Sequence, residues 1–258
     1  MPEFLRHQLN LFWLAVSFFS RLPTPATLAF SSDNMHRAGV YFSTVGWLLA
    51  LIMMLVYYIM APLIGIQPAV GLLIALNLLL TGAFHQDGLA DMFDGFYGGF
   101  DQQQKLQIMK DSRIGTYGSC ALVVSLLLQF VCLTTLAEQQ HLYLALGIAY
   151  PLSRAMALSH VQSLPYVSAG ERELSKSTAL VNGYALPQLT ILFVVASLAL
   201  WWLSLIHIAT LIAACLLLRA LLNNRFKYHI QGITGDCLGA AQQCQELLIY
   251  MILIALMR

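Results

Sequence analysis

The sequence predicts an all-α, polytopic helical membrane protein with about seven transmembrane helices, arranged as a single domain over residues 1–258. Composition is the first observation behind this fold class: 59% of the residues are hydrophobic and 10% are charged, whereas soluble domains carry roughly 25% charge. The second is that the apolar residues form uncharged runs, most of them near the length of about 20 residues that a helix needs to cross a bilayer. No repeat or linker divides the chain, and no basic stripe indicates a nucleic acid partner.

The expected spans follow one another along the chain. They cover residues 40–61, 69–84, 117–137, 142–158, 184–206, 208–222 and 237–257, and the fifth and sixth are expected to form a tight hairpin. An earlier apolar run within residues 8–20 ends at Ser-Arg-Leu-Pro rather than at a small-residue cleavage site, so we expect a retained helix and not a signal peptide. Whether that helix spans the bilayer or lies in its interface stays open.

The basic residues indicate an orientation. When the spans alternate, one side collects Arg6, Arg21, Arg37, Lys105, Lys110, Arg113, Arg172, Lys176, Arg225 and Lys227, and the other side receives only Arg258. Positive residues are enriched in cytoplasmic loops. The sequence therefore predicts a cytoplasmic N-terminus, an external C-terminus and a cytoplasmic position for the polar motifs described next.

An acidic motif follows the second expected span. Residues 84–95 read Phe-His-Gln-Asp-Gly-Leu-Ala-Asp-Met-Phe-Asp-Gly, and a helix would place Asp87, Asp91 and Asp94 on one stripe. Oxygen ligands favour a hard ion such as Mg²⁺, which binds a few carboxylates together with substrate phosphates. A solvated acidic turn is the alternative. His85, beside the stripe, is a candidate base or metal ligand, and a structural histidine is the competing interpretation.

The next polar segment carries cations. Asp101 is expected to cap a short amphipathic helix that ends near residue 109. Residues 109–118 then read Met-Lys-Asp-Ser-Arg-Ile-Gly-Thr-Tyr-Gly, in which Lys110 and Arg113 flank Asp111. Both cations are suited to phosphate oxygens, although Arg113 could equally anchor the start of a helix.

Two spans contain ionisable residues. Arg154 lies inside the fourth span, where it needs a partner, a cavity or a path to the interface. We expect it to contact either a substrate phosphate or Glu246. Asp236 opens the last span, where it could cap the helix, and Glu246 lies ten residues later on a similar face. Together they predict a polar cavity, expected against the helix that carries the acidic motif.

Taken together, three phrases closely resemble the cobalamin synthase family, the adenosylcobinamide-GDP ribazoletransferases. They are residues 84–95, residues 109–118 and the Thr-Gly-Asp-Cys-Leu-Gly-Ala of residues 234–240. The Phe-Ser-Arg-Leu-Pro-Thr-Pro of residues 19–25 and the Ser-Arg-Ala of residues 153–155 are similar to further family landmarks, in the same order. One departure is Gln231, which precedes Gly232 where the family pattern leads us to expect two glycines.

The resemblance implies a Mg²⁺-dependent transferase of late vitamin B12 biosynthesis, placed as a multi-pass protein in the bacterial inner membrane with a cytoplasmic-side site. Its donor would be adenosylcobinamide-GDP and its acceptor α-ribazole or α-ribazole 5′-phosphate, giving GMP and adenosylcobalamin or its 5′-phosphate. On this interpretation the catalytic residues are His85, Asp87, Asp91 and Asp94, the three aspartates being metal ligands, and the substrate-binding residues are Lys110, Asp111, Arg113, Arg154, Asp236 and Glu246.

Several points stay open. The sequence does not fix whether one or two metal ions bind, which group is the general base, or which lower-ligand base is accepted. A homo-oligomer and an association with other enzymes of cobalamin assembly are both compatible with it.

A CDP-alcohol phosphotransferase is the alternative enzyme, because Asp91-x-x-Asp94-Gly95 matches the start of that family's motif. The Ala-Arg and the later aspartates of that motif are missing from this chain. A cation or metabolite transporter ranks lower, since transporters place such groups near the midplane of repeated halves.

Overall fold

The computed structural model describes residues 2–168 and 183–257, and within these residues every regular element is a helix. The all-α prediction is confirmed. The α-helices are α1 (Glu3–Phe19), α2 (Ser32–Ala38), α3 (Phe42–Ile64), α4 (Ile66–Thr81), α5 (Phe84–Gly98), α6 (Gln102–Lys110), α7 (Thr116–Glu138), α8 (Leu142–Leu158), α9 (Leu186–Ala196), α10 (Leu205–Ile230) and α11 (Gly235–Leu256), with short 3₁₀ turns η1 (Gly39–Tyr41), η2 (Ser159–Gln162) and η4 (Leu198–Trp202). Three basic residues used above for orientation, Arg172, Lys176 and Arg258, lie outside the described residues.

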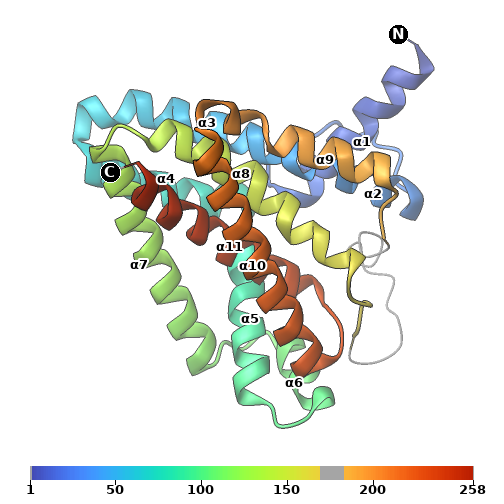
Figure 1. Ribbon diagram of the computed structural model, residues 1–258. Coiled ribbons are helices and arrows are strands. Elements are labelled where there is room, and N and C mark those ends of the chain that lie inside the picture. The colour runs from blue at the N-terminus through green and yellow to red at the C-terminus, as the bar shows by residue number, and fades with distance from the viewer. Residues whose placement is uncertain (1, 169–182, 258) are drawn as a thin grey trace.

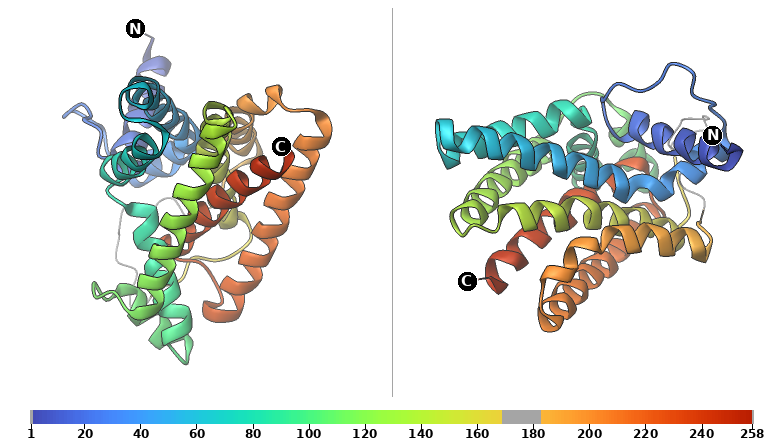
Figure 2. Two further views of the ribbon diagram at one scale, coloured as in Figure 1. Left: turned by 90° about the vertical axis from the view of Figure 1, so that its left-hand side faces the viewer. Right: turned by 90° about the horizontal axis from the view of Figure 1, so that it is seen from above.

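The helices are arranged as a layer at one end and a set of helices that runs away from it (Figure 1). Helices α3, α4 and α9 lie across the top of the view, while α5, α7 and α10 run toward the opposite end, where α6 lies. Helix α8 is buried along almost its whole length, and α11 packs against α5, α7, α8 and α10 (Figure 2). The polar motifs therefore sit around a central pair of helices, α8 and α11.

Five helical segments within the described residues are long and apolar enough to cross a membrane, and a sixth forms if α4 and α5 count as one bent span. The prediction of a polytopic membrane protein is confirmed, but the estimate of about seven spans is too high by this criterion. The segment at residues 184–206 is wrong as a continuous span, because α9 is only 11 residues long and is followed by the 3₁₀ turn η4.

Helix α10 also differs from the prediction. It runs for 26 residues from Leu205 to Ile230 instead of ending at residue 222. The side chain of Ser204 accepts the backbone N–H of His207 and so caps its start. Its last two turns contain Asn223, Arg225 and Lys227, so hydropathy alone ended the expected helix where it became polar. Gln231, which follows it, has a φ of 55°, in the left-handed region where glycine is the usual residue.

A sharp bend joins α4 to α5. The two helix axes meet at 85°, and the connecting residues Gly82 and Ala83, called here the α4–α5 elbow, both have left-handed backbone conformations, with φ of 63° and 55°. The backbone N–H of Arg21 donates to the carbonyl of Leu80 at 2.6 Å, which satisfies one of the carbonyls left open at the end of α4. The elbow turns the helix that carries the acidic motif away from α4.

The short amphipathic helix predicted after the acidic motif is α6. Asp101 is its N-cap, and its Oδ1 accepts the backbone N–H of Gln104 at 2.8 Å. The side-chain amide of Gln102 donates to the carbonyl of Ile230 at 2.8 Å. This bond ties α6 to the polar end of α10, so both elements lie at the end of the molecule toward which α5 runs.

Candidate active site

Helix α5 presents the three predicted aspartates on one side. Asp87 is exposed, Asp91 is half-buried and Asp94 is buried. The acidic stripe, as we call Asp87, Asp91 and Asp94, therefore runs from the surface near the α4–α5 elbow into the packed part of the helix. This arrangement follows from spacings of four and three residues on a helix with about 3.6 residues per turn.

Asp94 links α5 to the start of α7. Its two carboxylate oxygens accept the backbone N–H groups of Gly115 and Gly118 at 2.7 and 2.8 Å. These are among the N–H groups that a helix leaves without an internal partner, and a carboxylate there also complements the helix dipole. A Cβ atom at Gly115 would lie 2.5 Å from Oδ1 of Asp94, so the glycine leaves room for this contact. The first and second predicted motifs are thus joined directly.

A close crossing of α5 and α11 brings a fourth carboxylate to the stripe. A Cβ atom at Gly88 would lie 2.9 Å from both the Cα and the carbonyl oxygen of Asp236, and a Cβ at Gly239 would lie 3.4 Å from the Cα of Gly88. Asp236, Asp87 and Asp94 are all near enough for their charges to act on Asp91. The three phrases of the resemblance therefore converge on one place.

Among the residues that the structure describes, no cation lies within ion-pair distance of these four carboxylates. Every ion pair within 4.0 Å among the described residues involves other acids, namely Asp33, Asp111 and Glu246. Clustered like charges are costly unless a cation joins them. No three His, Cys, Asp or Glu side chains of the described chain are close enough to hold a metal ion by themselves. The cluster thus fits an ion that takes one or two carboxylates and completes its shell with water and substrate phosphates, as Mg²⁺ does.

His85 is separated from the stripe. At about 100° per residue it projects from the opposite side of α5, where it is 3% exposed and its ring centroid lies 5.8 Å from that of Phe42. Neither ring nitrogen has a hydrogen-bond partner among the described residues. Of the four residues predicted to be catalytic, the structure brings the aspartates together and leaves His85 apart from them.

The predicted phosphate-binding cations lie at the rim. Lys110 ends α6 and is exposed, and Arg113 is exposed in the connection to α7. Arg113 donates from Nε and Nη2 to the carboxylate of Asp111, with 2.6 Å between Nη2 and Oδ2. These hydrogen bonds lower the pKa of Asp111 to about 2, so the pair stays ionised at neutral pH. Gly115, which binds Asp94, is two residues beyond Arg113, so the pair borders the acidic stripe.

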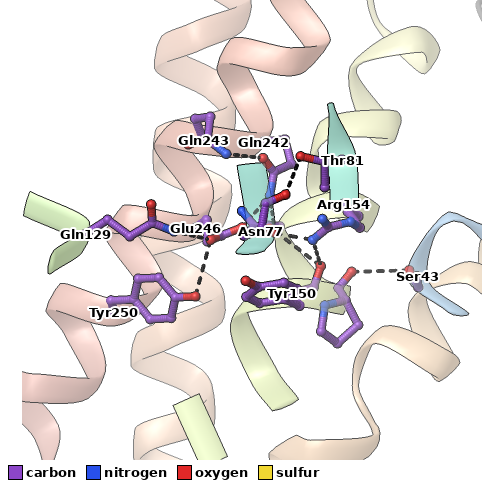
Figure 3. A network of polar contacts seen from close by, with 12 residues as sticks. Ser43, Asn77, Thr81, Gln129, Tyr150, Arg154, Gln242, Gln243, Glu246 and Tyr250 are labelled. Carbon is purple, nitrogen blue, oxygen red and sulfur yellow. Dashed lines mark hydrogen bonds and ion pairs between the residues drawn. The ribbon is translucent and has the colours of Figure 1, made fainter. Parts of the chain in front are cut away.

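Arg154 belongs to a buried polar network (Figure 3). Its side chain is 1% exposed, its Nη1 lies 3.9 Å from Oε2 of Glu246, and the same nitrogen donates to the carbonyl of Tyr150 at 2.8 Å. Of the two predicted contacts of Arg154, the one with Glu246 is present. The guanidinium is buried within the protein instead of being exposed at its surface, which speaks against the snorkelling alternative.

Glu246 accepts hydrogen bonds from three further side chains. Gln129 and Tyr250 donate to Oε1, each at 3.2 Å, and Gln242 donates to Oε2 at 2.5 Å. Sequence reasoning missed these partners, although the glutamines in the first half of the last apolar run were a usable signal: Gln242 lies one helical turn before Glu246. The network joins α7, α8 and α11 and satisfies a carboxylate that would otherwise be costly to bury.

Two details of the last helix correct the predictions. The N-cap of α11 is Thr234, whose hydroxyl accepts the N–H of Cys237 at 3.2 Å, and not Asp236. Asp236 and Glu246 also contact different helices. Asp236 lies against α5, whereas Glu246 meets α7 and α8. One continuous cavity against α5 was therefore the wrong expectation, because the two acids are ten residues apart along α11, which is almost three helical turns, or about 15 Å.

Comparison with known proteins identifies the family of this chain. The sequence model of the family described as cobalamin-5-phosphate synthase matches residues 11–254. A protein of Pseudoalteromonas atlantica named adenosylcobinamide-GDP ribazoletransferase is 51% identical over 98% of this chain and 94% of its own length. Proteins of the same name from Vibrio cholerae and Shewanella pealeana are 47% and 41% identical, over 100% and 97% of this chain and 98% and 97% of theirs. No solved structure matches the chain. Because the family model covers residues 11–254 and the relatives are similar over nearly the whole length, the chain belongs to the cobalamin-5-phosphate synthase family.

Proposed function

We propose that this protein is an adenosylcobinamide-GDP ribazoletransferase that joins the adenosylcobinamide phosphate of adenosylcobinamide-GDP to α-ribazole or α-ribazole 5′-phosphate and releases GMP. Family membership and the shared name of the relatives support the proposal. The single structural observation that carries it is the acidic stripe with Asp236 beside it and no described cation within 4.0 Å. Such a cluster suits a reaction whose substrate carries a diphosphate and whose charge needs a metal cation.

Mg²⁺ is the cofactor that this donor set favours. Asp87 and Asp91, with Asp236 across from them, are the side chains that would hold it, while both oxygens of Asp94 are already engaged with α7. When bound, the ion supplies positive charge that lets a diphosphate approach the carboxylates and that neutralises the departing GMP. In this arrangement Asp94 fixes α7 against α5 and keeps the rim segment with Lys110 and Arg113 beside the stripe.

The transfer is a displacement at phosphorus. A hydroxyl oxygen of the acceptor ribose bonds to the phosphorus attached to cobinamide, and the bond from that phosphorus to the bridging oxygen breaks, so GMP leaves with the bonding electrons. The hydroxyl proton passes to a carboxylate. Asp87 suits this role because it is the exposed member of the stripe, whereas His85 lies on the far side of α5. Lys110 and Arg113 would contact phosphate oxygens of the donor.

We place the site on the cytoplasmic side of a bacterial inner membrane. The support is the charge at the end of the molecule that holds the stripe. There, α6, the connection from α6 to α7 and the last turns of α10 carry Lys105, Lys110, Arg113, Arg225 and Lys227. Basic residues flank membrane spans mainly on the cytoplasmic side.

A release assay tests the proposal. The purified full chain in lipid is given adenosylcobinamide-GDP and Mg²⁺, with and without α-ribazole, and GMP and cobalamin are measured together. We expect GMP only when the acceptor is present, in equal amount to the cobalamin formed, and its loss when EDTA is added. A parallel reaction with CDP-diacylglycerol and an alcohol acceptor covers the alternative enzyme class. Release of CMP there, or no acceptor-dependent GMP, would overturn the proposal.

A further inference from the structure

A second polar site lies beside the stripe, on the other side of the α4–α5 elbow. A pocket of about 310 Å³ opens between α1, α2 and the elbow, and its wall includes Ser17, Arg21, Phe30, Thr81, Phe84 and Asp87. This size is at the lower end of the range of about 300–1,000 Å³ found for small-molecule sites. Asp87 belongs both to this wall and to the acidic stripe, so whatever fills the pocket touches the edge of the proposed reaction site.

Arg21 is the only cation of the pocket wall in the described chain. Its backbone N–H is bonded to the carbonyl of Leu80, which fixes the residue at the end of α4. Its side chain lies over the elbow, since a Cβ atom at Gly82 would be 2.6 Å from Nε of Arg21. No carboxylate of the described residues lies within the 4.0 Å of an ion pair with it. Its guanidinium therefore lies over the elbow with its charge available to an anion.

Aromatic rings form the apolar part of the wall. Phe84 packs edge-to-face on Phe18 with their centroids 5.5 Å apart, and Phe30 is 55% exposed. Exposed rings of this kind suit the stacking of a planar base. The pocket thus offers aromatic rings, one cation and one carboxylate that adjoins the stripe. A ligand that matches has a planar aromatic base, a hydroxyl-bearing sugar and a phosphate.

We infer that this pocket receives the acceptor, with Arg21 binding its phosphate, the phenylalanines contacting its base and Asp87 facing its ribose hydroxyl. The inference rests on the proposed function. A phosphorylated acceptor is the form to expect, since the family is described as a cobalamin-5-phosphate synthase. Repulsion from Asp87 would turn the phosphate toward Arg21 and leave the sugar at the edge of the stripe, where the displacement takes place.

The test separates acceptor from donor and phosphate from base. Acceptor affinity of the full chain is measured without donor in phospholipid-free detergent micelles, using α-ribazole and α-ribazole 5′-phosphate, and KM is measured for each acceptor and for adenosylcobinamide-GDP. The variants are Arg21→Gln, Phe30→Leu and the control Arg37→Gln. The control Arg37→Gln removes the same charge from neighbouring α2. Arg37 is paired with Asp33 and does not line the pocket.

Arg21→Gln should weaken binding of the phosphorylated acceptor about 10- to 100-fold, as expected for a lost charge-assisted hydrogen bond, and leave α-ribazole and the donor unchanged. Phe30→Leu should weaken both acceptors alike, and Arg37→Gln neither. An increase confined to the KM of the donor would overturn the inference, as would unchanged affinities. An effect of Arg21→Gln that arises only when phosphatidylglycerol is added would assign the site to a lipid phosphate and overturn it too. A wild type that releases no GMP with either acceptor would instead defeat the proposed function.

Discussion

Asp91 is the half-buried member of the acidic stripe, and the charges of Asp236, Asp87 and Asp94 all act on it. Asp91→Asn keeps the shape of the side chain and removes one charge from the cluster. We expect the rate of GMP release to fall at least about 10²-fold, as is common when an electrostatic catalytic group is removed. Asp33→Asn, on exposed α2, is the matched control. Near-normal turnover of the Asp91 variant at limiting Mg²⁺ would exclude Asp91 as a ligand.

Arg154 and Glu246 are a buried ion pair, and each is costly without the other. Arg154→Met should destabilise the protein by about 3–5 kcal/mol, because Glu246 stays buried without its cation. The double variant Arg154→Met, Glu246→Gln should recover part of that loss in a melting experiment in detergent, but not activity. Arg37→Met, which removes an exposed arginine, serves as the control. Equal melting temperatures for all variants would show that the pair contributes nothing to folding.

Single residues differed in how well the sequence predicted them. The stripe could be predicted because it depends only on spacing within one helix. The contact of Glu246 with Arg154 was one of two predicted alternatives. Its hydrogen bond with Gln129 could not be predicted, since Gln129 reaches it from another helix. The sequence placed Arg21 in a motif and among the basic residues of one side, but assigned it no site. Its contribution to the pocket depends on the elbow at Gly82, which no local pattern in the chain describes.

At the scale of elements, the crossing of α5 and α11 assembles the site. Gly88→Ala would place a Cβ 2.9 Å from backbone atoms of Asp236, and a backbone cannot move aside as a flexible side chain can. We expect a loss of about 1–3 kcal/mol in stability from overpacking, together with a lower affinity for the donor as Asp236 shifts from the stripe. Melting and donor binding measure the two effects.

Gly98→Ala in the same helix is the control for this experiment. A Cβ there would have Ile108 Cδ1 as its neighbour, at 3.7 Å, an ordinary contact. Stability and donor affinity should therefore stay at the wild-type level. If Gly88→Ala behaves like Gly98→Ala, the two helices are not held at the distance that the structure gives.

Hydropathy predicted most helices for a physical reason: a backbone in lipid must satisfy its own hydrogen bonds, so apolar runs become helices. It misplaced the boundaries of α9 and α10, where the length of the helix differs from the length of the apolar run. Helix α9 is apolar but ends after 11 residues, and α10 continues as a helix through a polar end. The 85° bend between α4 and α5 was also unpredicted, because it depends on how Gly82 and Ala83 pack against the segment at Arg21.

For the whole molecule, α11 gives the sharpest expectation about orientation. It begins beside the stripe and runs for 22 residues, about 33 Å at 1.5 Å per residue, close to the thickness of the hydrocarbon core. A reporter fused after Arg258 should therefore be active only in its external form. A fusion after Arg113, at the stripe end, should be active only in its cytoplasmic form. Activity of both fusions in the same compartment would contradict the orientation.

The acidic stripe, the rim cations and the pocket at the elbow all lie on helix α5 or on segments that touch it. Under the proposed function, donor, acceptor, nucleotide product and corrinoid product then enter and leave by the same face. In such a reaction no net charge crosses the membrane. The transmembrane voltage, worth about 2.3 kcal/mol per charge per 100 mV, is therefore not a source of energy for it. An uncoupler that collapses the voltage should therefore leave turnover in sealed vesicles unaltered.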